Sequence, residues 1–389
     1  MKICACIAEY NPLHLGHVKH INYMKNVLGA EKIIVIMSGN FCQRGESAVL
    51  NKFVRAKQAI FAGADMVIEL PTVFAIGNAE TFATGAINLI DDLGCVDGIC
   101  FGVESGEKED YLKIAKSLIN ESKEYKSALK KHLEKGVSLA KAKCLALEET
   151  EGENFASILS SPNGVLGVEY AKALLKRKSS IEIFPLIREG DHNDKVLKKG
   201  ITSASSIREK IKAGEIKKVK GNVPPFVYKE LVPYPFGFEK MIMTKLLTES
   251  EETLKKLPDC TEGLENRLKA LSKENLTVEG LVAKATTKRY PSSRIRRILI
   301  SNLLGITENL KNDCLSKPLY AKVLAISSDS KELISLLSKK SSIPVITRKS
   351  DGERLTKTAK LCFEKDSLAV ELYNLATDDK QNEHYMLII

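Results

Sequence analysis

The chain has no tryptophan, and aromatic residues make up only 6% of its 389 residues. It also has no apolar run near the roughly 20 residues that a membrane-spanning helix requires, so no membrane partner is expected. Its N-terminus has a short apolar run without the cleavage-site pattern of a secretion signal. The nine cysteines include no Cys-x-x-Cys pair, which is typical of reduced thiols. These absences predict a cytoplasmic protein without structural disulfides.

The remaining composition is that of an ordinary globular protein, with 44% hydrophobic and 28% charged residues. A chain of this length has room for two or three domains. The formal net charge of +10 favours a polyanionic partner, although an excess spread over so long a chain can also serve solubility alone.

Short apolar runs alternate with helical patterns through the first half of the chain. The runs lack a clean alternation of apolar and polar residues, as expected of parallel strands that are buried on both faces. Strands are predicted at 3–8, 32–37, 66–70, 98–102 and 181–187, and helices at 18–27, 52–62, 77–92 and 162–176. This order predicts an α/β fold with a Rossmann-like, doubly wound parallel sheet.

The first predicted strand runs directly into the segment His14-Leu15-Gly16-His17, which a helical pattern follows. A helix N-terminus offers free N–H groups and a partial positive charge, which suit phosphate. Two histidines three residues apart can face the same anion, and Gly16 would let the backbone approach it closely. The segment lies where open α/β sheets bind their ligands, so we expect it to bind phosphate.

Two other interpretations of the histidine pair are weaker. A His-x-x-His spacing often occurs by chance on a protein surface. A zinc site would need further ligands, and no Glu or Cys follows at the spacing of known zinc motifs. We therefore predict no metal held by the protein itself.

Two parts of the chain depart from this alternation, an insertion in the first half and most of the second half. Residues 108–149 form a lysine- and glutamate-rich helical insertion, and a Pro-Pro pair at 224–225 follows a lysine-rich stretch. Residues 225–312 are predicted to be helical, and from residue 320 a strand–helix pattern returns as a small α/β unit. We expect a catalytic domain at 1–215 and a mainly helical, basic region at 216–389.

One segment of this region is strongly basic. Residues 287–297 read Thr-Lys-Arg-Tyr-Pro-Ser-Ser-Arg-Ile-Arg-Arg. Apolar residues at helical spacing make a solvated helix face one explanation, and an RNA contact is another. The candidate RNA-binding residues are Lys288, Arg289, Arg294 and Arg297.

Several blocks of the sequence resemble one known family. The first is 7–17, Ile-Ala-Glu-Tyr-Asn-Pro-Leu-His-Leu-Gly-His, and the second is 37–46, Met-Ser-Gly-Asn-Phe-Cys-Gln-Arg-Gly-Glu. Others are 63–71, 101–102, 161–167, 262–266 and 287–290. Together they resemble tRNA(Met) cytidine acetate ligases, which belong to the nucleotidylyltransferase superfamily with a His-x-Gly-His motif.

The resemblance implies a reaction and a set of site residues. The reaction is the ATP-dependent adenylation of acetate, followed by acetyl transfer to N4 of the wobble cytidine of elongator tRNA(Met), with release of pyrophosphate and AMP. His14 and His17 would be catalytic. The ATP site would comprise Ile7, Ala8, Glu9, Tyr10, Asn11, Pro12, Leu13, His14, Leu15, Gly16, His17, Val18, Lys19, His20, Gly102, Asn163 and Arg188. Mg²⁺ is expected with ATP, and Arg44 and Arg208 are further candidates to contact acetate, phosphate or tRNA.

Three other functions stay open on the sequence alone. A nucleotidylyltransferase for a small phosphorylated substrate would share the histidines but would give the basic segment no role. A non-catalytic RNA-binding protein would have no need of His14, Gly16 and His17. A metal-dependent hydrolase would need carboxylate ligands that do not occur at useful spacing.

Overall fold

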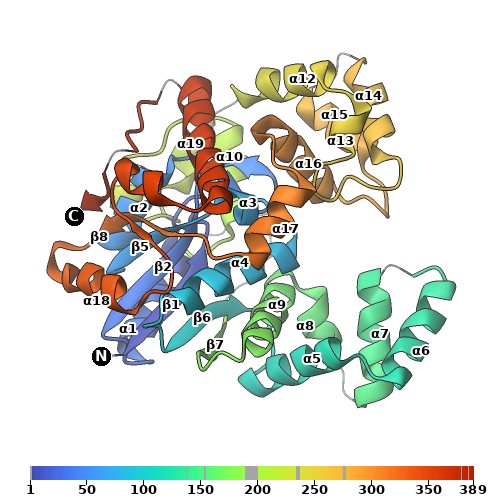
Figure 1. The fold of residues 1–389 in the computed structure, drawn as a ribbon, viewed down its shortest axis with the longest axis horizontal. Coiled ribbons are helices and arrows are strands. Elements are labelled where there is room, and N and C mark those ends of the chain that lie inside the picture. Colours follow the sequence, from blue (N-terminus) through green and yellow to red (C-terminus); the bar gives the residue numbers. More distant parts are fainter. Residues whose placement is uncertain are drawn as a thin grey trace.

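The computed structural model describes residues 2–137, 139–152, 155–188, 200–233, 237–274, 277–377, 379–383 and 385–389. Helices surround a central mixed sheet of eight strands (Figure 1). The strand order is β10-β8-β5-β2-β1-β6-β7, with β9 paired to β8. Their bounds are β1 Ile3–Ala8, β2 Lys32–Ser38, β5 Met66–Leu70, β6 Gly98–Val103, β7 Glu182–Ile187, β8 Ala321–Ile326, β9 Val345–Ile346 and β10 Leu387–Ile388. The predicted α/β class is confirmed, and the predicted strands of the first half agree with β1, β2, β5, β6 and β7.

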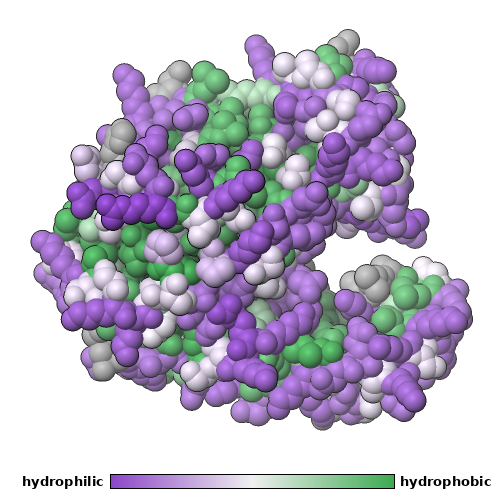
Figure 2. Space-filling view, viewed as in Figure 1, coloured by the Kyte–Doolittle hydropathy of each residue, from purple (hydrophilic) through white to green (hydrophobic). Residues whose placement is uncertain are grey.

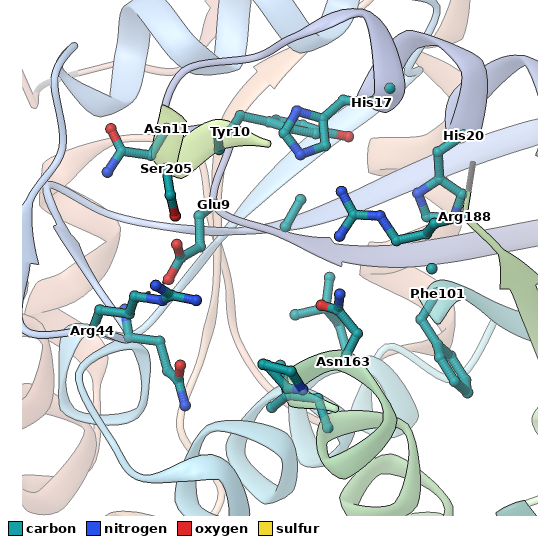
Figure 3. A pocket seen from close by; sticks show the side chains of 18 of the residues that line it. Glu9, Tyr10, Asn11, His17, His20, Arg44, Phe101, Asn163, Arg188 and Ser205 are labelled. Atoms are coloured by element: carbon teal, nitrogen blue, oxygen red, sulfur yellow. Dashed lines mark hydrogen bonds between the residues drawn. The ribbon is translucent and has the colours of Figure 1, made fainter. Parts of the chain in front are cut away.

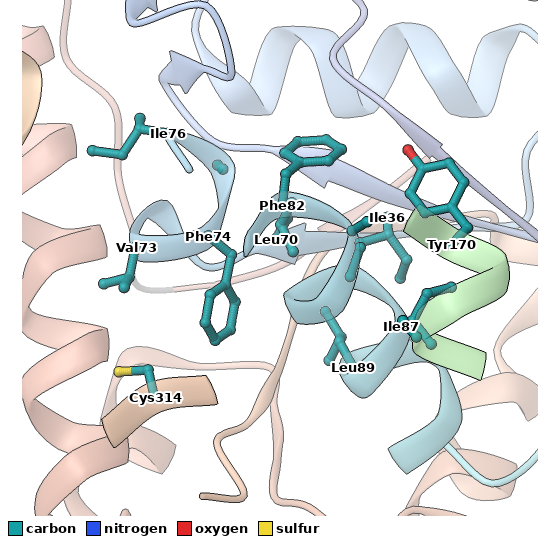
Figure 4. Packing of buried hydrophobic residues seen from close by; sticks show 14 of the residues in the cluster. Ile36, Leu70, Val73, Phe74, Ile76, Phe82, Ile87, Leu89, Tyr170 and Cys314 are labelled. Carbon is teal, nitrogen blue, oxygen red and sulfur yellow. The ribbon is translucent and has the colours of Figure 1, made fainter. Parts of the chain in front are cut away.

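The long central strands contribute to two hydrophobic cores because successive side chains point to opposite faces of the sheet. Along β2, Ile34 and Ile36 belong to one core, and Ile33, Val35 and Met37 belong to the other. The first core includes residues of α4 (Ala79–Asp92) and α9 (Pro162–Arg177), as Figure 4 shows for Ile36, Ile87 and Tyr170 among others. The second core includes residues of α1 (Leu15–Asn26), α2 (Lys52–Phe61) and α10 (Ala204–Lys212).

The sheet is not purely parallel, which corrects one sequence expectation. Strand β8 pairs antiparallel with β5, with Glu69 opposite Lys322 and Met66 opposite Ile326. The chain therefore enters β8 at the carboxyl edge of the sheet and runs back across it. The strands after residue 320 extend the main sheet and do not form a separate small unit. The predicted domain boundary near residue 215 stays a proposal. Since the last strands belong to the main sheet, the second domain would consist of the helical region alone.

Helices fill the remainder of the described chain. An insertion between β6 and α9 contains α5 Lys108–Asn120, α6 Lys123–Glu134, α7 Leu139–Glu151 and α8 Ala156–Ser160. The helical region contains α11 Pro225–Tyr228, α12 Phe238–Thr248, α13 Glu251–Leu254, α14 Leu264–Ser272, α15 Val278–Ala285, α16 Ser292–Leu304 and α17 Glu308–Ser316. Helices α3 Thr72–Ala75, α18 Glu332–Lys340 and α19 Lys357–Thr377 complete the set. Among these described helices, none has the length and apolarity to cross a membrane.

The insertion and the helical region project from the same side of the sheet body (Figure 1). A space-filling view shows a hollow between them, with mostly hydrophilic residues on its rims (Figure 2). The antiparallel hairpin of β3 (Phe41–Cys42) and β4 (Glu46–Ser47) follows β2 at the carboxyl edge of the sheet. These additions bring distant parts of the sequence to the edge where β1 ends.

Candidate active site

The start of α1 is built by its two histidines. His14 is the N-cap residue, and its Nδ1 accepts a hydrogen bond from the backbone N–H of Gly16 at 3.1 Å. The Nδ1 of His17 accepts one from the backbone N–H of His14 at 3.2 Å. The two rings stack with their centroids 3.7 Å apart. This reciprocal capping fixes both rings at the end of β1.

The same hydrogen bonds determine where the protons lie. A ring nitrogen that accepts a hydrogen bond carries no proton, so each imidazole is neutral and holds its proton on Nε2. Burial, and then the neighbouring His14, lower the pKa of His17 well below its usual value. The histidines can therefore serve an anion as neutral N–H donors rather than as cations.

Gly16 also has a structural role at the start of α1. A Cβ at this position would lie 2.9 Å from Cε1 and 3.1 Å from Nδ1 of His14. Gly16 also lines the cavity. The capping ring of His14 thus constrains this position to glycine, and the close approach of a phosphate to its backbone stays a prediction.

A second group of predicted residues meets at the ends of β6 and β7. The two strands pair in parallel, and Arg188 continues β7 with its backbone N–H donating to the carbonyl of Val103 at 2.8 Å. A Cβ on Gly102 would lie 3.0 Å from Cγ and Cδ of Arg188, so the glycine leaves room for this side chain. Asn163, in the first turn of α9, donates to Oε1 of Glu104 at 2.6 Å.

Arg188 also affects the third histidine of the segment. Burial, and then the positive charge of Arg188, lower the pKa of His20 to about 4. Nε2 of His20 lies 3.1 Å from Sγ of Cys100. Burial likewise lowers the pKa of Arg188 itself. His17 and His20 are thus neutral at pH 7, and Arg188 brings the cationic charge to this side of the site.

Arg55 of α2 fastens the strand ends below the site. Its guanidinium donates to the backbone carbonyls of Glu9 at 2.6 Å, Ser38 at 3.0 Å and Leu50 at 2.8 Å, and also to that of Gly39. The Arg55 side chain is fully buried. It therefore ties the ends of β1 and β2 to the loop that leads into α2.

The histidines of α1, Gly102, Asn163 and Arg188 surround one cavity of about 820 Å³. Figure 3 shows Glu9, His17, Asn163 and Arg188 pointing toward its common space. Of the predicted ATP-binding residues, the cavity lining includes Ile7, Ala8, Glu9, Tyr10, Asn11, His14, Gly16, His17, Lys19, His20, Gly102, Asn163 and Arg188. Pro12, Leu13, Leu15 and Val18 are not among the lining residues, and Leu13 is fully buried in a hydrophobic core.

Other elements also line the cavity, among them the β3–β4 hairpin, α16, α4 and α10, and they bring residues that the site prediction did not name. The β3–β4 hairpin contributes Gln43 and Glu46, and the first turns of α16 contribute Ser292, Ser293 and Arg296. In the sequence, the hairpin was marked only by the block at 37–46 that resembles the family, and α16 only by the basic segment at 287–297. Their convergence depends on tertiary packing that no local pattern shows.

Arg44 and Arg208 both line the cavity as well. Arg208 is almost fully buried, and its Nη1 donates to the carbonyl of Asn11 at 2.9 Å. Its Nε lies 3.7 Å from Oε2 of Glu46. Arg208 thus fixes the loop after β1, while Arg44 is exposed at the hairpin tip.

The four basic RNA-binding candidates fall into two pairs. Lys288 and Arg289 are exposed, and Arg289 forms an ion pair with Glu262. Arg294 donates to the carbonyl of Asp259 at 2.9 Å, and Arg297 contacts a carboxylate oxygen of the same residue at 3.4 Å. Arg297 also lines the cavity, so the segment runs from the outer surface to the site.

Comparison with known proteins agrees with this geometry. Residues 1–386 match the model of the HIGH nucleotidyl transferase family. A tRNA(Met) cytidine acetate ligase of Acetivibrio thermocellus is 38% identical, over 96% of this chain and 94% of its own. One from Caldanaerobacter subterraneus subsp. tengcongensis is 39% identical, over 97% and 96%. The chain belongs to this family of HIGH nucleotidyl transferases, the tRNA(Met) cytidine acetate ligases.

Solved structures of the family support the same conclusion. The crystal structure of apo Thermotoga maritima TmcAL matches with a TM-score of 0.92 at 28% identity, and covers all of both chains. The structure of that protein bound with alpha-thio ATP matches with a TM-score of 0.89. The family resemblance inferred from the sequence motifs is confirmed.

Among the described residues, no group of three or more His, Cys, Asp or Glu could hold a metal ion.

Proposed function

We propose that this chain is an ATP-dependent acetate ligase that forms N4-acetylcytidine at the wobble position of elongator tRNA(Met). The observation that carries the proposal is the pair of neutral histidines at the start of α1, which share one cavity with Gly102, Asn163 and Arg188. Donors at a helix N-terminus and a cation across the cavity are the groups that a nucleoside triphosphate requires.

In the first step, an acetate oxygen attacks the α-phosphorus of ATP. The bond from this phosphorus to the bridging oxygen of the β-phosphate breaks, and pyrophosphate leaves with the electron pair. Acetate is already an anion and needs no base. The protein must stabilise charge on the phosphates, which suits Nε2 of His14 and His17 and the N–H groups at the start of α1.

We propose that Gly102, Asn163 and Arg188 hold the nucleotide from the opposite side of the cavity. Asn163 is oriented by Glu104, and Gly102 leaves room for Arg188. Mg²⁺ is expected to arrive with ATP. A magnesium ion on a nucleotide takes most of its ligands from phosphate oxygens and water, so it requires few or no ligands from the protein.

In the second step, N4 of the cytidine attacks the acetyl carbon of acetyl-AMP. The bond from the acetyl carbon to the phosphate oxygen breaks, AMP leaves, and one N4 proton is released. We propose that Lys288 and Arg289 bind tRNA phosphates, and that Arg294 and Arg297 hold the segment between surface and cavity. The tRNA substrate also implies a cytoplasmic location.

The proposal is tested by incubating the purified protein with ATP, labelled acetate and total bacterial tRNA, followed by nucleoside mass spectrometry. Labelled N4-acetylcytidine is expected, and His14→Ala is expected to abolish it. Acetate-independent release of pyrophosphate without label in RNA would instead favour a nucleotidylyltransferase for a small phosphorylated substrate.

A further inference from the structure

The cavity has two walls, and only one of them holds the residues assigned above to ATP. That wall consists of the end of β1, the starts of α1 and α9 and the ends of β6 and β7. The other wall consists of the β3–β4 hairpin and the first turns of α16, with Gln43, Ser292, Ser293 and Arg296. We propose that this second wall is the acceptor subsite, where the cytidine to be acetylated binds. This inference rests on the proposed function.

Acyl transfer places a strict limit on where the cytidine can be. The attacking N4 must lie about 3–3.5 Å from the acetyl carbon. Since acetyl-AMP forms in this cavity, the base must enter the same cavity, unstacked from its neighbours in the RNA. Within the described lining, the second wall is a polar part that carries no residue assigned above to ATP.

The second wall is a fixed surface, because the hairpin packs directly on α16. Gly45, at the turn of the hairpin, has a φ of +73°. A Cβ at this position would lie only 2.4 Å from the backbone nitrogen of Arg297. Arg296 is held from the other side by Glu279 of α15, with Nη1 and Oε1 at 2.8 Å. Hairpin and helix therefore present their side chains to the cavity together.

The chemistry of this wall suits cytosine. With N4 engaged in the reaction, the remaining Watson–Crick groups of cytosine are acceptors, N3 and O2. The Gln43 amide, the two serine hydroxyls and the Arg296 guanidinium all offer hydrogen-bond donors. Uracil presents an N–H at position 3, which the Arg296 guanidinium cannot accept, and it has no amine at position 4 that could be acetylated.

The chain also connects this wall to the surface proposed for RNA. Residues 287–290 are exposed or half-exposed and carry Lys288, Arg289 and Tyr290. The ring of Tyr290 lies 5.2 Å from the guanidinium carbon of Arg294. Helix α16 starts two residues after Tyr290 and leads directly to Ser293 at the cavity. An RNA strand bound over 287–290 thus has its flipped base beside the second wall.

Two variants test the subsite. Ser293→Trp fills the second wall from a half-exposed helical position, and Gln43→Ala removes the amide but keeps the backbone N–H that donates to Glu9 at 2.7 Å. Each is measured for ATP affinity by equilibrium dialysis and for N4-acetylcytidine formation at saturating ATP and acetate. Ser338→Trp, at an exposed position on α18, is the matched control.

We expect N4-acetylcytidine formation to fall at least 100-fold in Ser293→Trp and at least tenfold in Gln43→Ala. The ATP dissociation constant should stay within twofold in both, and the control should match the unsubstituted protein. Selective loss of transfer in Gln43→Ala supports the subsite even where Ser293→Trp does not fold. Transfer within threefold of normal in both variants, or loss that only parallels loss of ATP affinity, overturns it. Failure of the unsubstituted protein to form the product would instead overturn the proposed function.

Discussion

The two ring nitrogens of His17 have separate tasks. Nδ1 accepts the backbone N–H of His14 and so closes the first turn of α1. Nε2 carries the proton and is the atom available to a phosphate. An effect of substituting His17 can therefore come from a damaged helix start or from a missing donor. Isosteric amides separate the two, because Asn places its oxygen near Nδ1 and Gln places its nitrogen near Nε2.

We predict that His17→Asn keeps the fold and loses the reaction. The asparagine oxygen can still accept the N–H of His14, so the melting temperature should change by only a few degrees. Loss of the Nε2 donor should lower kcat by about 10²–10³, as for one donor to a developing charge. His17→Gln should retain more activity at lower stability. Equal loss of activity in both variants, with equal melting temperatures, would contradict the assignment of the two nitrogens.

At the residue scale, the sequence predicted which residues line the cavity better than it predicted their contacts. His14 and His17 could be chosen because the motif lies between an apolar run and a helical pattern. The close contact of Gly16 with the ring of His14 could not be predicted, since it depends on how that ring folds back over the helix start. Gln43 and Arg296 lack any local pattern that would bring them to the cavity.

A buried network of ion pairs joins α2, β5, β8 and the C-terminal segment that contains Glu383. Lys52 at the start of α2 contacts both oxygens of Glu69 on β5, at 2.9 and 2.8 Å. Lys322 on β8 lies 3.2 Å from Glu69 and 2.6 Å from Glu383. Lys52 pairs with Glu383 as well. Alternating charges of this kind fasten the C-terminal segment to the antiparallel edge of the sheet.

We predict that Glu383→Gln destabilises the fold in a pH-dependent way. The two lysines lower the pKa of Glu383 from 4.5 to about 2, against the effect of burial. A pKa lowered in the folded state contributes stability that is present above pH 4.5 and lost as the pH falls through 2. The variant should therefore cost about 3 kcal/mol at pH 7, and roughly half as much at pH 3.

Denaturant unfolding at both pH values measures this difference. Glu332→Gln is the control, because Glu332 pairs with Lys32 at 2.8 Å while its side chain is 54% exposed. An exposed pair should contribute less than about 1 kcal/mol. A cost for Glu383→Gln that is the same at pH 3 and pH 7 would contradict the ionic origin of the effect.

An element could be predicted from the sequence where a local pattern determines it, and not where contacts between distant segments determine it. The strands of the first half could be found because burial on both faces produces continuous apolar runs, such as 33–37 within β2. The direction of β8 could not, since its apolar run is the same in either orientation. It depends on the helical region returning the chain to the carboxyl edge, where Lys322 meets Glu69.

Across the whole molecule, the basic side chains differ in what they contact. Arg208, Arg296 and Arg297 are held by carboxylates around the cavity. Insertion helix α6 carries lysines that face glutamates, with Lys131 and Glu149 at 2.9 Å. Lys288 and Arg289 are exposed on the chain that leads into the cavity. The net charge alone therefore does not indicate where a polyanion binds, whereas the position of exposed basic residues relative to the cavity does.

We predict that the double variant Lys288→Ala/Arg289→Ala weakens tRNA binding and reduces its dependence on salt. Removal of one phosphate-binding cation should lower the slope of log affinity against log salt by about one unit. The Glu262 partner of Arg289 makes the effect of that residue smaller, because its charge is partly offset already. Filter binding of tRNA across a salt series measures both quantities.

Lys130→Ala/Lys131→Ala on α6 is the matched control, because it removes the same charge from the insertion and should leave the slope unchanged. An equal change in both double variants would mean that tRNA responds to the overall charge of the protein, and a change only in the α6 variant would move the RNA to the insertion side of the hollow.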